Sequence, residues 1–100
     1  MLLTIDTSEM EKAVVTLGTQ RLTVCFQKGA GQKVLALIEE GLREKKATLA
    51  EIAEIRVKQG PGSFNGLRVG VTIANILGYF LKIPVNGRII TKRNFLLPRY

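Results

Sequence analysis

The stretch Gln59-Gly-Pro-Gly-Ser-Phe-Asn-Gly-Leu-Arg68 separates residues 52–58, which are typical of a strand, from residues 67–81, which are typical of a long helix. Glycines at positions 60 and 62 permit backbone angles that residues with a Cβ resist. Ser63 and Asn65 are good N-cap residues for the helix that follows. The stretch therefore predicts a sharp strand-to-helix turn.

The same turn has a second interpretation, because the free N–H groups at the start of a helix can hold an anion. Arg68 adds a positive charge near the partially positive end of the helix, so we expect an anionic neighbour. Asp6, a carboxylate of a partner or a phosphate would serve, and a carboxylate is favoured. The candidate anion-binding turn comprises Gly60, Gly62, Ser63, Asn65 and Arg68. A purely structural turn is the alternative, since short glycine motifs are weak without context.

The run over residues 67–81 is apolar around nearly its whole helical circumference, which indicates burial on more than one side. Small residues recur at every fourth position, at Gly66, Gly70, Ala74 and Gly78. An interior glycine costs about 1 kcal/mol relative to alanine, so we expect these positions to admit another backbone closely. One hundred residues provide little chain to cover the second face, so we predict that another protein chain covers it. A helix hidden within the domain is the alternative.

The first half of the chain predicts three short strands followed by a helix over residues 32–46. The strands are expected at residues 2–5, 13–17 and 21–26, and a last one at 82–85. Apolar residues of the first helix recur at i, i+3, i+4 and i+7, so they form one face. This face comprises Val34, Leu37, Ile38, Gly41 and Leu42.

Charge is unevenly distributed along this chain of net charge +7. Residues 55–100 contain eight basic side chains and no acidic one, whereas residues 1–54 contain all eight acids and seven bases. This asymmetry indicates an anionic partner, either nucleic acid or an acidic protein surface. A basic solubilising face is the alternative.

Other features of the composition bear on location and metal binding. The lone Cys25 excludes an internal disulfide and fits a reducing compartment, so we expect a cytoplasmic protein. We expect no signal peptide, because residues 1–5 reach an acid at Asp6 and have no basic leader. No apolar run reaches the ~20 residues of a membrane span, so no membrane partner is expected. The absence of histidine argues against a transition-metal site.

Enzyme chemistry has little support in the residues. Asp6 ends the first expected strand, where a nuclease would place a metal carboxylate, but two-metal sites need several carboxylates and no acid follows Glu54. A Ser/His hydrolase fails for lack of histidine. We therefore expect no catalytic residue, no metal and no cofactor, and we interpret Asp6, Thr7 and Ser8 as strand-end structural residues.

The predicted order strand, strand, strand, helix, strand, helix, strand is that of a ribonuclease-H-like domain, the half-domain of the actin and sugar-kinase superfamily. We expect an α/β fold with a mixed five-stranded sheet over residues 1–86 and a short basic tail over 87–100, which either adds an edge strand or reaches over a partner. Three segments also resemble the YeaZ/TsaB family over residues 2–85. They are Leu3-Thr-Ile-Asp-Thr-Ser8, Leu49-Ala-Glu-Ile-Ala-Glu-Ile55 and, most specific, Gly60-Pro-Gly-Ser-Phe-Asn-Gly-Leu-Arg-Val-Gly70 with Ile83-Pro-Val85.

This resemblance implies a non-catalytic subunit in the synthesis of threonylcarbamoyladenosine (t6A) in tRNA. It implies pairing through the two long helices, either as a homodimer or with a TsaD-like catalytic subunit, with a TsaE-like ATPase joining and indirect tRNA contact left open. The partner interface expected from this resemblance comprises Val34, Leu37, Ile38, Gly41, Gly66, Val69, Gly70, Ile73, Ala74, Leu77 and Gly78. The residues themselves leave two alternatives: a nucleic-acid-binding module using the basic C-terminal half, and a phosphate or nucleotide binder at the Gly60–Arg68 turn.

The chain departs from the family pattern at several points. Asn65 replaces the usual threonine of the turn, and Gly31-Gln32 replaces a polar, often histidine-containing, helix start. Family members carry a second half-domain after the strand ending at Val85, so from one half-domain we expect no interdomain nucleotide cleft. A short form, a fragment and a divergent homodimeric relative all fit this pattern.

Overall fold

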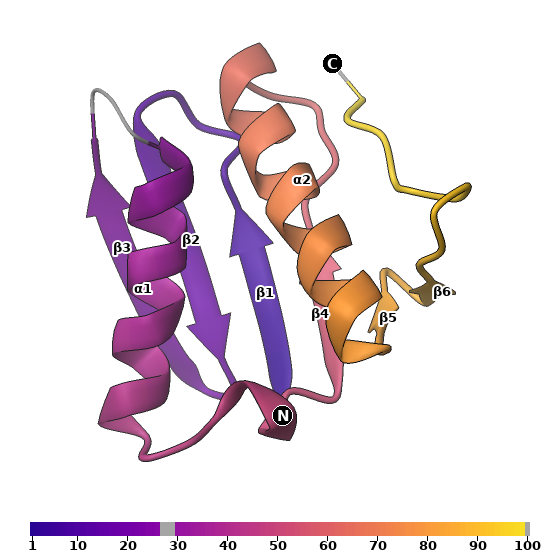
Figure 1. Cartoon of the computed structure of the whole chain (residues 1–100). Helices are drawn as coiled ribbons and strands as arrows, with labels where there is room; N and C mark the ends of the chain where they lie inside the picture. The colour runs from indigo at the N-terminus through magenta and orange to yellow at the C-terminus, as the bar shows by residue number, and fades with distance from the viewer. Residues whose placement is uncertain (27–29, 100) are drawn as a thin grey trace.

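A computed structural model describes residues 1–26 and 30–99 of the chain. Its elements are, in order, β1 (Leu2–Asp6), β2 (Lys12–Leu17), β3 (Gln20–Cys25), α1 (Ala30–Glu44), the 3-10 turn η1 (Leu49–Glu51), β4 (Glu54–Val57), α2 (Phe64–Leu81), β5 (Pro84–Val85) and β6 (Arg88–Ile89). The strands form one mixed sheet in the order β3-β2-β1-β4-β5-β6. Both helices cover the same face of this sheet (Figure 1).

The α/β class and the predicted order of elements are confirmed, but the prediction of five strands is wrong. The Asn86-Gly87 turn folds the chain back, and β6 pairs antiparallel with β5 as a sixth strand. Downstream, Ile90 and Leu96 are both buried. Residues predicted as a tail therefore belong to the sheet and the core.

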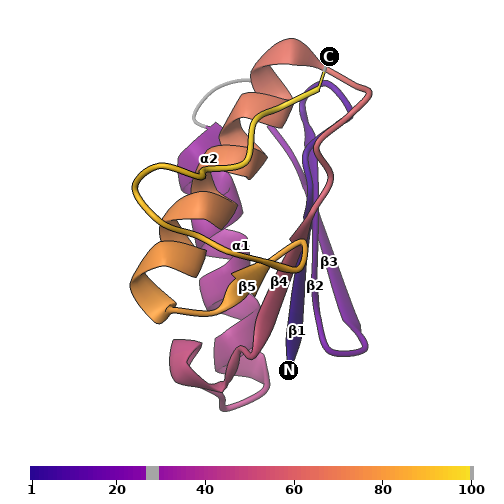
Figure 2. The ribbon, with the colours of Figure 1, turned by 90° about the vertical axis from the view of Figure 1, so that its right-hand side faces the viewer.

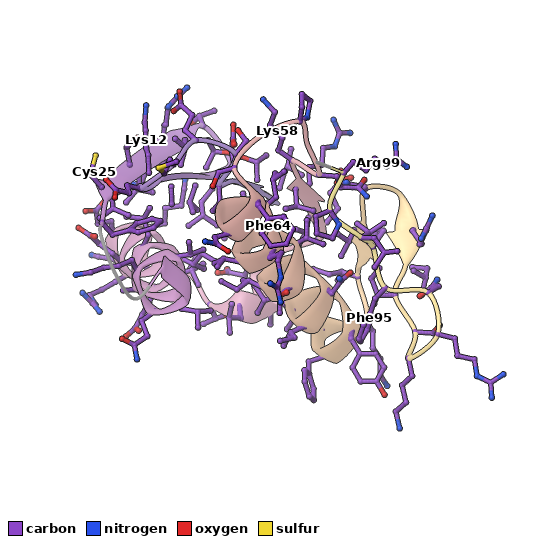
Figure 3. All side chains as sticks on the ribbon, turned by 90° about the horizontal axis from the view of Figure 1, so that it is seen from above. Lys12, Cys25, Lys58, Phe64, Phe95 and Arg99 are labelled. Atoms are coloured by element: carbon purple, nitrogen blue, oxygen red, sulfur yellow. The ribbon has the colours of Figure 1, made fainter. Side chains whose placement is uncertain are left out.

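The core lies between the sheet and the helices, because side chains alternate along each strand. Leu3 and Ile5 of β1, with Val15 and Leu17 of β2, are fully buried beneath the helices. On the opposite face Thr4 and Thr16 lie side by side and share a hydrogen bond. Viewed from above, Lys12 and Lys58 lie on the side of the sheet away from the helices (Figure 3).

The small residues of α2 pack against strands of the same chain. A Cβ added to Gly66 would meet the carbonyl oxygen of Thr7, and one added to Gly70 would meet the Thr7 hydroxyl. A Cβ on Gly78 would meet the Val85 side chain, and Ala74 is fully buried. The prediction that this stripe admits a second protein chain is therefore wrong: β1 and β5 approach it closely.

The C-terminal segment, residues 90–99, runs along α2 beside β5 and β6 (Figure 2). The buried Asn75 side chain holds it, donating to the Leu96 carbonyl oxygen at 3.0 Å and accepting from the Leu96 N–H at 2.9 Å. Arg99 N–H donates to the Gln59 carbonyl oxygen at 2.6 Å, next to the glycine turn. The chain itself thus covers part of the helix face that was predicted to need a partner.

Candidate partner-docking face

The glycine turn is bonded tightly to the end of β1. Ser63 N–H donates to the Ser8 carbonyl oxygen at 2.7 Å, and the Ser63 hydroxyl accepts from Gly66 N–H at 3.3 Å as the predicted N-cap. Gly62 leaves no space for a Cβ, which would lie 2.5 Å from the Ser8 carbonyl oxygen. Gly60 has a φ of +146° and faces the Arg99 carbonyl group. These three predicted anion-site residues therefore build the turn itself.

The residues at the end of β1 and directly after it make local hydrogen bonds. One carboxylate oxygen of Asp6 accepts from the Ser8 N–H at 2.9 Å and from its hydroxyl at 2.6 Å. The Thr7 hydroxyl, fully buried, donates to the Gly66 carbonyl oxygen at 2.6 Å. The structure therefore joins β1 to the first turn of α2 by direct hydrogen bonds.

The environment of Asp6 also sets its charge. Partial burial raises the pKa of its carboxyl group, but the two hydrogen bonds from Ser8 and the positive charges of Lys58 and Arg21 lower it more. The resulting pKa lies below the ordinary value of 3.8, so Asp6 is a carboxylate at neutral pH. Within the described ranges no group of three or more potential metal ligands comes together around it or elsewhere.

Arg68 and Asn65, the other two residues of the predicted anion site, reach the protein surface. The Arg68 guanidinium lies 5.5 Å from the centre of the Phe64 ring, a cation–π arrangement. Among residues 1–26 and 30–99, no acidic side chain forms an ion pair with Arg68, so the expected Asp6 neighbour is not there. Anion binding at this turn stays a prediction.

Two separate hollows lie between the two helices, and together they are called the two-helix groove. The upper hollow, about 390 Å³, lies at the start of α2, and the lower hollow, about 310 Å³, lies beside the end of α1. Val69 and Ile73 line the upper hollow and Leu77 lines the lower one, and their spacing at i, i+4 and i+8 places both hollows on the same face of α2. The two-helix groove is lined by Gly31, Leu35, Ile38, Glu39, Leu42, Leu49, Asn65, Arg68, Val69, Thr72, Ile73 and Leu77.

Large apolar side chains stand exposed along this groove. Leu35 of α1 is 49% exposed, Ile76 of α2 is 47% exposed, and Leu49 of η1 is also exposed. Water contact with such side chains is unfavourable by roughly 25 cal/mol per Å² of apolar surface. An apolar groove flanked by exposed aliphatic side chains is the kind of surface that receives another protein.

The structure divides the predicted interface residues into two groups. Ile38, Val69, Ile73 and Leu77 line the two-helix groove. The other seven pack inside the domain, so the prediction that they face a partner is wrong; they are Val34, Leu37, Gly41, Gly66, Gly70, Ala74 and Gly78. The sequence analysis did not include Leu35 and Ile76 in the interface. Each is an apolar residue that lies off the main apolar face of its helix, and this position could have identified it.

Comparison with known proteins identifies the chain's relatives. The family model described as TsaD, tRNA N6-adenosine threonylcarbamoyltransferase, matches residues 27–87. The "tRNA threonylcarbamoyladenosine biosynthesis protein TsaB" of Bacillus subtilis is 27% identical over 90 residues, or 86% of this chain. The TsaB of Buchnera aphidicola subsp. Schizaphis graminum is 38% identical over 55 residues, or 55% of this chain. The solved structure of YeaZ from Pseudomonas aeruginosa superposes with a TM-score of 0.71 at 26% identity over 84% of this chain.

The chain therefore belongs to the family that the TsaD model describes, and within it the chain is similar to TsaB proteins and to the YeaZ structure. The predicted resemblance to YeaZ/TsaB is confirmed. The chain spans 39% of the Bacillus TsaB, 26% of the Buchnera TsaB and 41% of the YeaZ chain.

Proposed function

We propose that this chain is a non-catalytic subunit of the machinery that makes t6A in tRNA. In this role it docks through the two-helix groove onto a TsaD-like catalytic subunit or onto a second copy of itself. The observation that supports this proposal most is the pair of hollows between α1 and α2, with Leu35 exposed in the lining of the lower one and Ile76 exposed on α2.

Two further findings support a non-catalytic role. A TsaB of known pathway is similar along 86% of the chain, whereas the tRNA N6-adenosine threonylcarbamoyltransferase of Geotalea daltonii is similar along 56% of it and 16% of its own length. The acidic group nearest a strand end, Asp6, is occupied in local hydrogen bonds with Ser8. A TsaE-like ATPase remains a further predicted member of the assembly.

The test is co-expression of the full chain with a TsaD-like protein from the same source, followed by size-exclusion chromatography with light scattering. We expect a complex, or a homodimer of the chain alone at micromolar concentration. Leu35→Glu should weaken either association at least tenfold, because it places a charge in an apolar contact.

Met10→Glu is the matched control, since Met10 is 77% exposed in the β1–β2 turn, away from the groove. This variant should associate like the original chain. A monomer that binds no TsaD-like protein would overturn the proposal. Equal effects of Leu35→Glu and Met10→Glu on association would show that the contact lies outside the two-helix groove.

A further inference from the structure

A second surface lies at the opposite end of α2 from the glycine turn, and the proposed docking role does not use it. A hollow of about 490 Å³ opens there between the last turn of α2 and the β6 region. Its volume falls within the range of small-molecule sites, roughly 300–1,000 Å³. This C-terminal hollow is lined by Tyr79, Phe80, Lys82, Ile89, Ile90, Thr91 and Lys92.

Aromatic rings lie in and next to this hollow: Tyr79 and Phe80 line it, and Phe95 lies against Tyr79 outside its lining. The Tyr79 ring meets the Phe80 ring edge-to-face at 5.5 Å between centres, and the Phe95 ring edge-to-face at 6.5 Å. Phe80 is 74% exposed and Phe95 is 45% exposed, so both rings offer apolar surface to solvent. Figure 3 shows Phe95 beside the C-terminal end of α2.

Cations surround these rings without acidic neighbours. Lys82 and Lys92 line the hollow, and Arg88 and Arg93 lie on β6 and the loop that follows it. No acidic residue occurs after Glu54 in the sequence. Among the described residues, none of these four cations takes part in an ion pair. The positive charge of this corner is therefore uncompensated locally.

The loop that carries two of these cations is held in shape by its own hydrogen bonds. The Asn94 amide accepts from Thr91 N–H at 2.5 Å and donates to the Ile89 carbonyl oxygen at 2.7 Å. The Arg88 guanidinium donates to the Asn94 carbonyl oxygen at 3.3 Å. A pre-shaped loop loses less conformational entropy when a ligand binds.

We infer that the C-terminal hollow binds single-stranded nucleic acid, with bases stacking on Phe80 and Phe95 and phosphates meeting Lys82 and Lys92. Exposed aromatic rings interspersed with cations are the combination by which proteins hold single strands without reading sequence. An acidic peptide would need the cations but not the rings. A membrane surface would bind apolar groups that protrude from the protein. A recess with flat rings is better suited to a base.

The sharpest test uses the absence of tryptophan from the chain. In Phe80→Trp the single indole reports only on this hollow. Titration with a single-stranded RNA of ~12 nucleotides, within the roughly 4–16 nucleotides that such sites cover, should quench its emission as a base stacks on it. Phe64→Trp is the control, since Phe64 is also exposed but lies roughly 24 Å away along α2 at ~1.5 Å per residue.

A fluorescently labelled copy of the same RNA, titrated with the original protein and with its variants, tests the contributions of Phe80, Lys82 and Lys92 by fluorescence anisotropy. Phe80→Ala should weaken affinity about tenfold. Lys82→Gln with Lys92→Gln should weaken it and reduce the slope of log K against log salt by about 1.4, at ~0.7 per phosphate contact. The control pair Lys33→Gln and Lys45→Gln, with the same charge change near α1, should retain the original slope.

Three results would overturn the inference. The first is equal quenching of the two tryptophan variants. The second is equal loss of affinity in the lysine pair and its control pair. The third is binding to anionic vesicles without binding to RNA. Failure of this inference leaves the two-helix groove untouched, because the two surfaces share no lining residue.

Discussion

At the scale of single residues, the contact between Thr7 and α2 determines how close the helix lies to the sheet. Thr7 is fully buried, its hydroxyl bonds to the Gly66 carbonyl oxygen, and Gly70 lies against its side chain. Glycine is required at position 70 because the Thr7 side chain, directly after β1 of the same chain, occupies the space of a Cβ. This reason is local to the fold and independent of any partner.

Gly70→Ala should therefore destabilise the fold by about 1–3 kcal/mol, the usual cost of overpacking. Gly31→Ala in α1 is the matched control, since nothing lies within 4 Å of its added Cβ. There alanine should stabilise the helix by up to ~1 kcal/mol. Urea unfolding of both variants measures the difference. Equal free energies of unfolding for the two variants would show that Thr7 and Gly70 are not in close contact.

Asp6 predicts a pH dependence of stability. Its pKa is lowered in the folded chain, so the unfolded chain binds the proton first as the pH falls. Its contribution to stability is present above the ordinary pKa of 3.8 and is lost as the pH falls through the lowered value. Asp6→Asn should therefore lose less free energy of unfolding than the original chain between about pH 5 and about pH 2.

Urea unfolding at several pH values provides the measurement. Glu40→Gln, which removes an exposed acid on α1, serves as the control. If the Asp6→Asn and original curves fall in parallel, the bonds from Ser8 do not stabilise the carboxylate.

At the scale of elements, α2 has different neighbours around its circumference. On one side the sheet covers Leu67, Val71 and Ala74. On another side the C-terminal segment covers Asn75. Val69 lines the two-helix groove and is partly exposed there. A buried polar residue on a helix needs a partner for each of its polar atoms. The two bonds from Asn75 to Leu96 therefore explain how an irregular segment stays fixed along α2.

Asn75→Ala should release the C-terminal segment, because it leaves the N–H and carbonyl groups of Leu96 without their partners. The loss should be about 1–3 kcal/mol of stability, with faster hydrogen exchange at the Leu96 amide and faster tryptic cleavage after Lys92 or Arg93. Thr72→Ala, at an exposed position on the same helix, should change neither rate. Unchanged exchange and cleavage in Asn75→Ala would show that other contacts hold the segment.

Much of this organisation is present in the sequence. Apolar periodicity predicted the helices and the alternating strands, and the glycine turn with its Ser63 cap was predicted from residue type alone. Periodicity does not reveal which neighbour fills the space beside a glycine, so Gly66, Gly70 and Gly78 were assigned to a partner. Residues 87–100 lack a clear period, so an edge strand there was only an open alternative, and neither the bounds of β6 nor the Asn75–Leu96 contact was predicted.

At the scale of the whole molecule, the sheet and its two helices leave distinct outer surfaces. The helix side presents the two-helix groove, and the end of α2 presents the C-terminal hollow with its uncompensated cations. No described helix is long and apolar enough to cross a membrane. The proposed sites of protein association and of nucleic-acid contact therefore lie on separate parts of the molecule.

Hydroxyl-radical footprinting of the chain, free and in its complex with a TsaD-like protein or with itself, tests the docking claim most directly. The account predicts that binding lowers oxidation of Leu35, Leu49 and Ile76, which are exposed along the two-helix groove. Met10, which is 77% exposed in the β1–β2 turn, should oxidise at the same rate in both states. Protection of Met10 or of the C-terminal hollow without protection of Leu35 and Ile76 would contradict the account.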